Sequence, residues 1–166
     1  TEIKITTAAY EFKGFMGMRN FIIETTDGKR LAWANSNWTH LVISTGLPAR
    51  LTPADTDNYV LSEKMEMDYA PRKIKLPDSM IPQESFAVQK HHLDTNHHVN
   101  NCQYICMAED FLPEDFKVYQ MRAEYKMQAK LGDTICPKTM TEAGKVVVSL
   151  NDENGKPYAV VEFTEK

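Results

Sequence analysis

One stretch of the chain decides its fold: Val99-Asn100-Asn101-Cys102-Gln103-Tyr104-Ile105-Cys106-Met107-Ala108-Glu109. Apolar side chains recur in it at the spacing of one face of an α-helix, and the same face ends on Glu109. The stretch therefore predicts an amphipathic helix of about three turns, which Pro113 ends. The positions expected to pack inward on this face are Val99, Cys102, Ile105 and Cys106.

Strand-like segments surround the predicted helix. A short apolar segment precedes it, and four segments rich in β-branched residues follow it, separated by turns that contain glycine. They are Ser85–Gln89 before the helix and Phe116–Met127, Thr134–Thr141, Lys145–Leu150 and Pro157–Thr164 after it. A strand, a helix and then four antiparallel strands indicate an α+β fold. Residues 84–166 are thus expected to form one complete module, an antiparallel sheet wrapped around a helix.

The first 50 residues contain strand patterns but no helix pattern. The segments are Thr1–Phe12, Arg19–Thr25 and Arg30–Ile43, with the hairpin signal Asp27-Gly28 between the last two. They look like the last three strands of a module whose first strand and helix are missing. Residues 1–50 are therefore expected to be a partial first module, truncated at its N-terminal side. Residues 44–83 hold five of the eight prolines, and residues 51–83 are expected to be a linker.

Composition excludes several function classes. The net charge is −4, from 19 basic and 23 acidic residues, which disfavours binding to nucleic acid. The longest apolar runs span only a few residues, too short for a membrane span. Three cysteines without a Cys-x-x-Cys pair fit a reducing compartment. We expect a cytoplasmic protein, or a plastid stromal one if the source is a plant.

The chemistry is concentrated between the predicted strand and the predicted helix. Four of the five histidines lie at positions 91, 92, 97 and 98. Asp94, Asn96 and His98 occupy alternate positions there, and could supply a hydrogen-bond acceptor, a polarising donor and a group that titrates near neutral pH. Unpaired N–H groups at the start of the helix would stabilise an oxyanion. These features allow a catalytic site, which is one of three interpretations of the same residues.

Other interpretations of the same residues remain open. Asp and Asn before a helix are common caps, and histidines in a polar loop are commonly solvated. The histidines and Asp94 are also a plausible metal-ligand set, but their spacing matches no zinc signature, and no metal is expected. Cys102 and Cys106 are expected to pack as small hydrophobic side chains, since neither lies in a nucleophile motif.

The stretch from Asp94 to Tyr104 resembles the pattern Asp-x-Asn-x-His-Val-Asn-Asn-x-x-Tyr of the acyl-[acyl-carrier-protein] thioesterases, and meets every fixed position. Upstream segments resemble the end of the family's first module: Arg19-Asn20-Phe21, Asp27-Gly28, Ala34-Asn35-Ser36-Asn37-Trp38 and Gly46-Leu47-Pro48-Ala49-Arg50. The resemblance implies a double hot-dog fold, with one full module and a partial first one.

The resemblance also implies a function and a set of site residues. The function is hydrolysis of fatty acyl thioesters in fatty acid biosynthesis, most directly of acyl-[acyl-carrier-protein], without a cofactor. The implied catalytic residues are Asp94, Asn96 and His98, supported by Asn100, Asn101 and Tyr104. Plant members of the family place a Glu, often followed by Cys, shortly after a Glu-Tyr pair, where this chain has Gln128 and Ala129. Because Gln cannot act as a base, Gln128 is expected to position the water that Asp94 or His98 activates.

Two other functions remain open. One is a non-catalytic module that binds acyl groups or a carrier protein, and the other is an acyl-CoA thioesterase. An acidic carrier protein would fit a small basic cluster in the linker region, formed by Lys64, Arg72, Lys73 and Lys75. A partial module leaves a sheet edge exposed, so the chain is expected either to form a homodimer or to be part of a longer chain.

Overall fold

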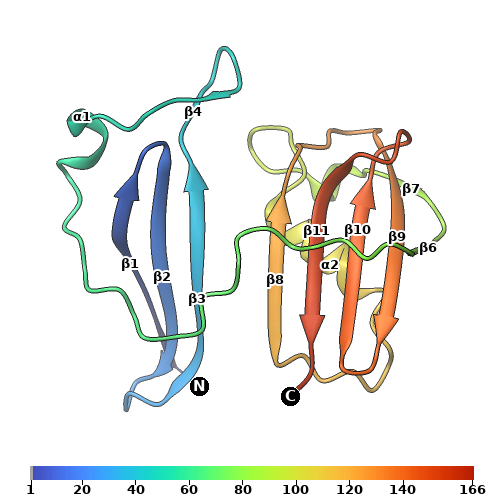
Figure 1. The fold of residues 1–166 in the computed structure, drawn as a ribbon, viewed down its shortest axis with the longest axis horizontal. Coiled ribbons are helices and arrows are strands. Elements are labelled where there is room, and N and C mark those ends of the chain that lie inside the picture. Colours follow the sequence, from blue (N-terminus) through green and yellow to red (C-terminus); the bar gives the residue numbers. More distant parts are fainter. Residues whose placement is uncertain (1) are drawn as a thin grey trace. The chain divides into compact units, whose positions relative to one another are not determined.

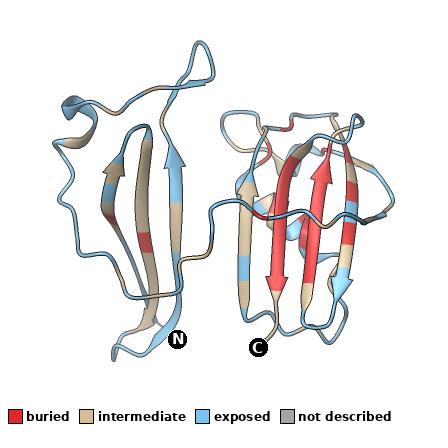
Figure 2. Ribbon diagram, in the orientation of Figure 1, coloured by how far each residue is buried: buried red, intermediate tan, exposed pale blue. Residues whose placement is uncertain are grey.

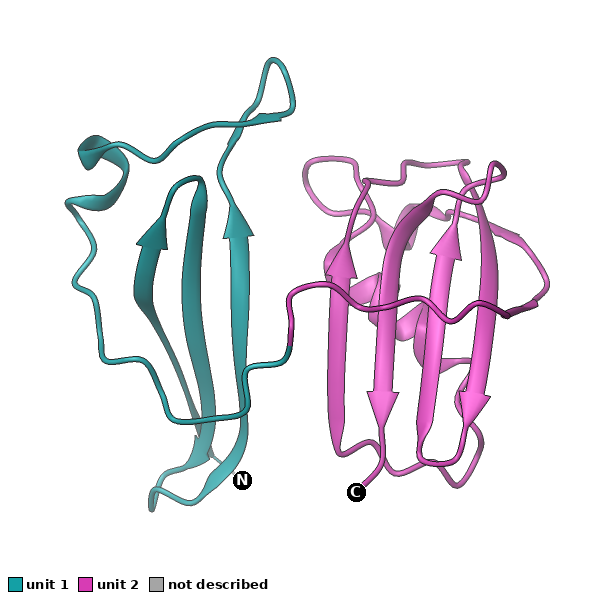
Figure 3. Ribbon diagram, in the orientation of Figure 1, with its two compact units in different colours: residues 1–70 teal, residues 71–166 magenta. Residues whose placement is uncertain are grey.

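Two main antiparallel sheets organise the chain in the computed structural model, which describes residues 2–166. They belong to two units, residues 1–70 and residues 71–166 (Figure 3). The boundary between the units falls inside the segment expected to be a linker, and the module boundaries at residues 50 and 83 stay a prediction.

The first unit is built on a three-stranded sheet in the order β1-β2-β3 (Figure 1). Its strands are β1 (Ile3–Lys13), β2 (Met16–Thr25) and β3 (Arg30–Thr39). The three strands expected here are therefore present, although the third ends earlier than predicted. A short hairpin of β4 (Leu41–Val42) and β5 (Leu47–Pro48) follows it. Gly28, in the turn between β2 and β3, has a φ of 87°, which glycine adopts without steric cost.

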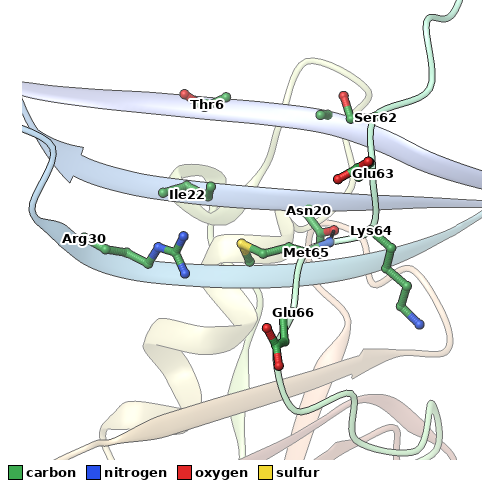
Figure 4. Close-up of a pocket in the computed structure, with 10 residues that line it drawn as sticks. Thr6, Asn20, Ile22, Arg30, Ser62, Glu63, Lys64, Met65 and Glu66 are labelled. Carbon is green, nitrogen blue, oxygen red and sulfur yellow. Dashed lines mark hydrogen bonds between the residues drawn. The ribbon is translucent and has the colours of Figure 1, made fainter.

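After α1 (Pro53–Thr56) the chain returns along this sheet, and Asn20 holds it there. The side-chain oxygen Oδ1 of Asn20 accepts a hydrogen bond from the Met65 N–H at 3.0 Å, and its side-chain NH2 group donates to the Tyr69 hydroxyl at 3.0 Å. Between the returning segment and the sheet lies a cavity of about 450 Å³ (Figure 4). The residues that line it are Thr6, Ala8, Asn20, Ile22, Arg30, Ser62, Glu63, Lys64, Met65 and Glu66.

The second unit wraps a larger sheet around one helix. The helix is α2 (Asn101–Glu109), and the main strands are β8 (Gln120–Tyr125), β9 (Thr134–Glu142), β10 (Lys145–Asn151) and β11 (Pro157–Thr164). Two short strands, β6 (Ile81–Pro82) and β7 (Phe86–Ala87), pair with β9, and the sheet order is β6-β9-β10-β11-β8. The predicted α+β class and hot-dog architecture are confirmed (Figure 1).

The core lies between α2 and the sheet, and β10 and β11 are its most buried strands (Figure 2). From the helix, the side chains of Tyr104, Met107 and Ala108 are buried. The predicted inward face of the helix is wrong in part, because Cys102 and Cys106 are exposed. A second series at helical spacing, 104, 107, 108 and 111, carries two large aromatic rings. That face buries more apolar surface, so it turns inward.

The outer face of the same sheet is covered by residues 71–82, which cross it from β8 to β9 (Figure 1). The Ile74 side chain, 5% exposed, packs on Val147 and Val160. The Ile74 N–H donates to the Glu124 carboxylate at 3.0 Å, and the Arg122 guanidinium donates to the carbonyls of Pro71 and Lys73. This cover explains why the run Val146–Val148 is apolar at successive positions: β10 is buried on both faces.

Within residues 2–166, no helix has the length and apolar character needed to cross a membrane.

Candidate functional site

Asp94, Asn96 and His98 lie together in one tight turn that precedes α2. The Asp94 N–H donates to the His98 carbonyl at 2.8 Å, and Leu93 pairs with Val99 as an isolated bridge. The Asp94 carboxylate oxygen Oδ1 accepts hydrogen bonds from the N–H groups of Asn96 and His98, at 2.8 and 3.3 Å. Asp94 therefore does cap the turn, as the structural interpretation of its position expects, and this capping holds the other two residues in place.

The same hydrogen bonds fix the charge of Asp94. Partial burial opposes ionisation, but the N–H groups of Asn96 and His98 outweigh it, and the Asn96 side chain and the nearby His98 add to their effect. The pKa of Asp94 is therefore below its ordinary value of 3.8. At neutral pH the turn contains a carboxylate whose negative charge lies beside His98.

Asn100 begins the helix. Its side-chain oxygen accepts from the Cys102 N–H at 2.9 Å, and its main-chain carbonyl accepts from the Gln103 N–H at 2.9 Å. This corrects the expectation that the N–H groups at the start of the helix are unpaired. Asn is a strong N-cap, so Asn100 takes two of these donors, and an oxyanion would need donors or charge from other groups.

Tyr104 and Ala129 join the turn to the segment that contains Gln128. The buried Tyr104 hydroxyl accepts from the Ala129 N–H at 2.8 Å, and the Ala129 carbonyl accepts from the Val99 N–H at 2.9 Å. Next to this pair, His98 (one residue before Val99) and Lys130 (one residue after Ala129) form an antiparallel bridge. The structure therefore brings Gln128 next to the turn, although the two segments are about 30 residues apart in the sequence.

Residue alternation places the functional side chains on one side of this pairing. Val99 and Ala129 are buried at 4% and 0% exposure, and successive residues of paired strands point to opposite sides. His98, Gln128 and Lys130 therefore lie on the side away from the core. Gln128 and Lys130 are exposed, and His98 is half-buried.

Two of the predicted site residues, the supporting Asn101 and the catalytic Asn96, lie at the surface. Asn101 is exposed, and its carbonyl accepts from the Tyr125 hydroxyl at 3.3 Å. Asn96 is exposed as well, and its side chain lies close enough to Asp94 to help lower the pKa of that carboxyl. All seven predicted site residues belong to the second unit: Asp94, Asn96, His98, Asn100, Asn101, Tyr104 and Gln128.

The other histidines of the stretch have different surroundings. His92 Nδ1 accepts from the Gln89 N–H at 3.0 Å, and burial together with the adjacent His91 lowers the pKa of His92. Its ring is therefore neutral at pH 7 and is held by its own short 3-10 turn, η1 (Lys90–His92). Among the residues that the structure describes, no group of three or more His, Cys, Asp or Glu side chains is arranged to hold a metal ion.

The predicted basic cluster is divided between the units. Lys64 lies in the first unit, with its ammonium 3.9 Å from the centroid of the Tyr69 ring, whereas Arg72, Lys73 and Lys75 lie in the second. Sequence reasoning missed a different cation, Lys130. Lys130 is two residues after Gln128, so in an extended segment the two side chains lie on the same side. The bridge to His98 shows that this side is the one that borders the turn.

Comparisons with known proteins identify the family and support the fold. Residues 77–162, more than half of the chain, match the family described as the acyl-ACP thioesterase C-terminal domain. An acyl-ACP thioesterase from Bacteroides thetaiotaomicron is similar in structure, with a TM-score of 0.85 at 18% identity, covering 98% of this chain and 68% of that one. No curated protein sequence matches the chain.

Two further structures show the same fold. The 12:0-ACP thioesterase from Umbellularia californica has a TM-score of 0.83 at 15% identity, covering 98% of this chain and 66% of that one. A putative oleoyl thioesterase from Lactobacillus plantarum has a TM-score of 0.77 at 22% identity, covering 97% and 66%. The chain thus spans about two thirds of the length of these proteins.

Proposed function

The chain belongs to the family of the acyl-ACP thioesterase C-terminal domain, and from this we propose that it hydrolyses fatty acyl thioesters to a free fatty acid and a thiol. The observation that carries the proposal is the turn at residues 94–98. In it a carboxylate held ionised, an amide and an imidazole are fixed within five residues, beside a segment that presents a second amide, Gln128.

The proposed reaction uses these groups in a definite order. His98 takes a proton from a water molecule held by Gln128, and the water oxygen attacks the thioester carbonyl carbon. The Asn96 amide donates a hydrogen bond to the carbonyl oxygen as it becomes negative. The C–S bond then breaks, and the proton held by His98 passes to the sulfur. The ionised Asp94 stabilises the imidazolium that forms between these two steps.

Acyl carrier protein is the proposed thiol carrier. The family is named for carrier-protein substrates, and Arg72, Lys73 and Lys75 add positive charge in the second unit. Acyl-CoA has the same reacting thioester and is the alternative substrate. The two differ only in what lies beyond the pantetheine arm, so rates on both substrates at matched acyl length decide between them.

The test is release of free thiol from acyl-[acyl-carrier-protein] and from acyl-CoA of several chain lengths. We expect release with the wild-type protein and a loss of at least 100-fold in kcat/KM for Asp94→Asn, the range typical of a lost acid–base partner. Asn at position 94 keeps an oxygen for the two N–H groups, so the turn is retained while the charge is lost. Thiol release unaffected by Asp94→Asn would contradict the assignment.

A non-catalytic binding module is the second candidate, because Gln128 stands where the plant enzymes have a carboxylate. This candidate predicts binding of the acylated carrier without thiol release. If the chain is such a binding module, both the wild-type protein and Gln128→Glu should be inactive. If it is a hydrolase that uses His98, the wild-type protein should already release thiol.

A further inference from the structure

We propose that Lys130 is a catalytic residue whose ammonium group stabilises the negative charge of the tetrahedral intermediate, and afterwards binds the carboxylate of the product. The inference rests on the proposed function, and it names the charge that acts at the same site. It starts from the pairing of the turn with the segment that follows β8.

The pairing fixes where Lys130 lies. Its backbone is the bridge partner of His98, and the neighbouring pair Val99 and Ala129 is buried and hydrogen-bonded at 2.9 Å. Directly opposed residues of antiparallel strands have Cα atoms about 4.5–5.5 Å apart and side chains on the same side. The Lys130 side chain therefore starts beside His98 and on the side of Gln128, within reach of a carbonyl that these residues act on.

The backbone at Lys130 is held from the other direction as well. Its N–H donates to the Asp133 carboxylate at 2.9 Å, and the Tyr158 hydroxyl lies 3.4 Å from the same oxygen. Burial and the negative charge of Asp133 raise the pKa of Tyr158 to about 12, so this hydroxyl keeps its proton and donates a hydrogen bond to the Asp133 carboxylate. The Asp133 carboxylate thus accepts hydrogen bonds from both groups, and it anchors the main chain from which the Lys130 side chain extends.

The surroundings make this positive charge effective. Residues 90–108 contain one acidic side chain, Asp94, and residues 125–132 contain none, in a chain whose net charge is −4. The Asp94 carboxylate is directed to the N–H groups of its own turn. The Asp133 carboxylate likewise accepts hydrogen bonds from the Lys130 N–H and the Tyr158 hydroxyl. Both nearby carboxylates are thus held by other donors, and the Lys130 ammonium supplies positive charge for a reaction that develops negative charge on oxygen.

The N–H groups at the start of α2 are not all free to stabilise an oxyanion. Asn100 uses two of the N–H groups that would otherwise face an oxyanion. Asn96 contributes a neutral amide, whereas Lys130 contributes a full charge. We expect Lys130 to act on kcat, because the negative charge exists in the transition state and not in the bound thioester.

The experiment uses octanoyl-N-acetylcysteamine, a thioester without phosphate or carrier protein, so that a docking role of Lys130 cannot affect the rate. We expect Lys130→Gln to lower kcat about tenfold with little change in KM, and Lys130→Arg to restore most of the rate. The control is Lys156→Gln, since Lys156 is exposed and its N–H is likewise held by a turn carboxylate, Asp152, at 2.7 Å. It should leave kcat unchanged.

Binding of octanoate and of octanamide, measured by calorimetry, is the second readout and does not need activity. We expect Lys130→Gln to weaken octanoate binding several-fold and to leave octanamide binding unchanged. An unchanged kcat in Lys130→Gln, or an equal effect on the acid and the amide, would overturn the inference. If the wild-type protein released no thiol at all, the proposed function and the catalytic role of Lys130 would both fail, while the calorimetry would still show whether Lys130 binds a carboxylate at this site.

Discussion

At the scale of single residues, Tyr104 shows how the core controls the site. Its ring is buried at 1% exposure, and its hydroxyl is the partner of the Ala129 N–H. Burial raises the pKa of Tyr104, so the hydroxyl stays protonated at neutral pH. One side chain therefore both fills the core under α2 and fixes the segment that carries Gln128 and Lys130.

Tyr104→Phe should uncouple these two roles. The ring keeps its packing, but the buried Ala129 N–H loses its acceptor, which costs about 1–3 kcal/mol of stability. We expect faster hydrogen exchange at the Ala129 amide and a lower kcat with little change in KM. Tyr119→Phe is the control, because Tyr119 is 62% exposed. Equal exchange rates at Ala129 in wild type and Tyr104→Phe would refute this role of the hydroxyl.

At the scale of elements, an ion-pair network supports the sheet of the second unit. Glu162 on β11 is 7% exposed, and its carboxylate contacts Arg122 and Lys145, each at 2.7 Å. Burial opposes ionisation of Glu162, but the hydrogen bonds and charges of Lys145 and Arg122 outweigh it and lower the pKa below 4.5. Arg122 also holds residues 71–73, so the network ties the covering segment to the sheet.

Glu162→Gln should destabilise the second unit by about 1–3 kcal/mol at pH 7. Because the folded pKa is the lower one, the ionised carboxylate contributes its full stability above about pH 4.5 and loses it as the pH falls through the folded value. The difference between wild type and variant should therefore shrink toward pH 3, as measured by amide exchange in β11. Lys4→Gln, which breaks the exposed pair Lys4–Glu24, should change stability by less than about 0.5 kcal/mol. A difference independent of pH would contradict the network's role.

The elements also show what could be predicted from the sequence. Strand positions were predictable because glycine turns separate them, and the helix was placed within two residues of its observed start at Asn101. The inward face of the helix could not be predicted in the same way, because two series of residues have helical spacing. Only the amount of apolar surface that each series buries decides between them. The meeting of His98 with Lys130 depends on long-range strand pairing, which no local pattern encodes.

At the scale of the whole molecule, the two units differ in how much they bury. In the first unit, of its described residues, Ala9 and Asn20 are the buried side chains, and large apolar residues such as Ile5 and Leu47 are 66% and 64% exposed. A three-stranded sheet with so small a core is marginal alone, and exposed apolar surface of this extent marks an interaction site.

We therefore expect the protein to associate with a second copy. Sedimentation equilibrium at micromolar concentrations should give twice the chain mass of 19.0 kDa, and Leu47→Asp with Ile5→Asp should shift the equilibrium toward the monomer. A wild-type monomer at all concentrations, with slowly exchanging amides in β1–β3, would show that the first unit needs no such partner.

The central claim is that the turn at residues 94–98 is the active site of a thioester hydrolase, and two neighbouring substitutions test it most directly. His97 is exposed with a φ of 61°, a conformation that Asn tolerates, so His97→Asn removes an imidazole from the same turn without straining it. We predict that His98→Asn lowers kcat/KM for acyl-thioester hydrolysis at least 100-fold, while His97→Asn stays within about twofold of wild type. Equal activity of the two variants would contradict the claim.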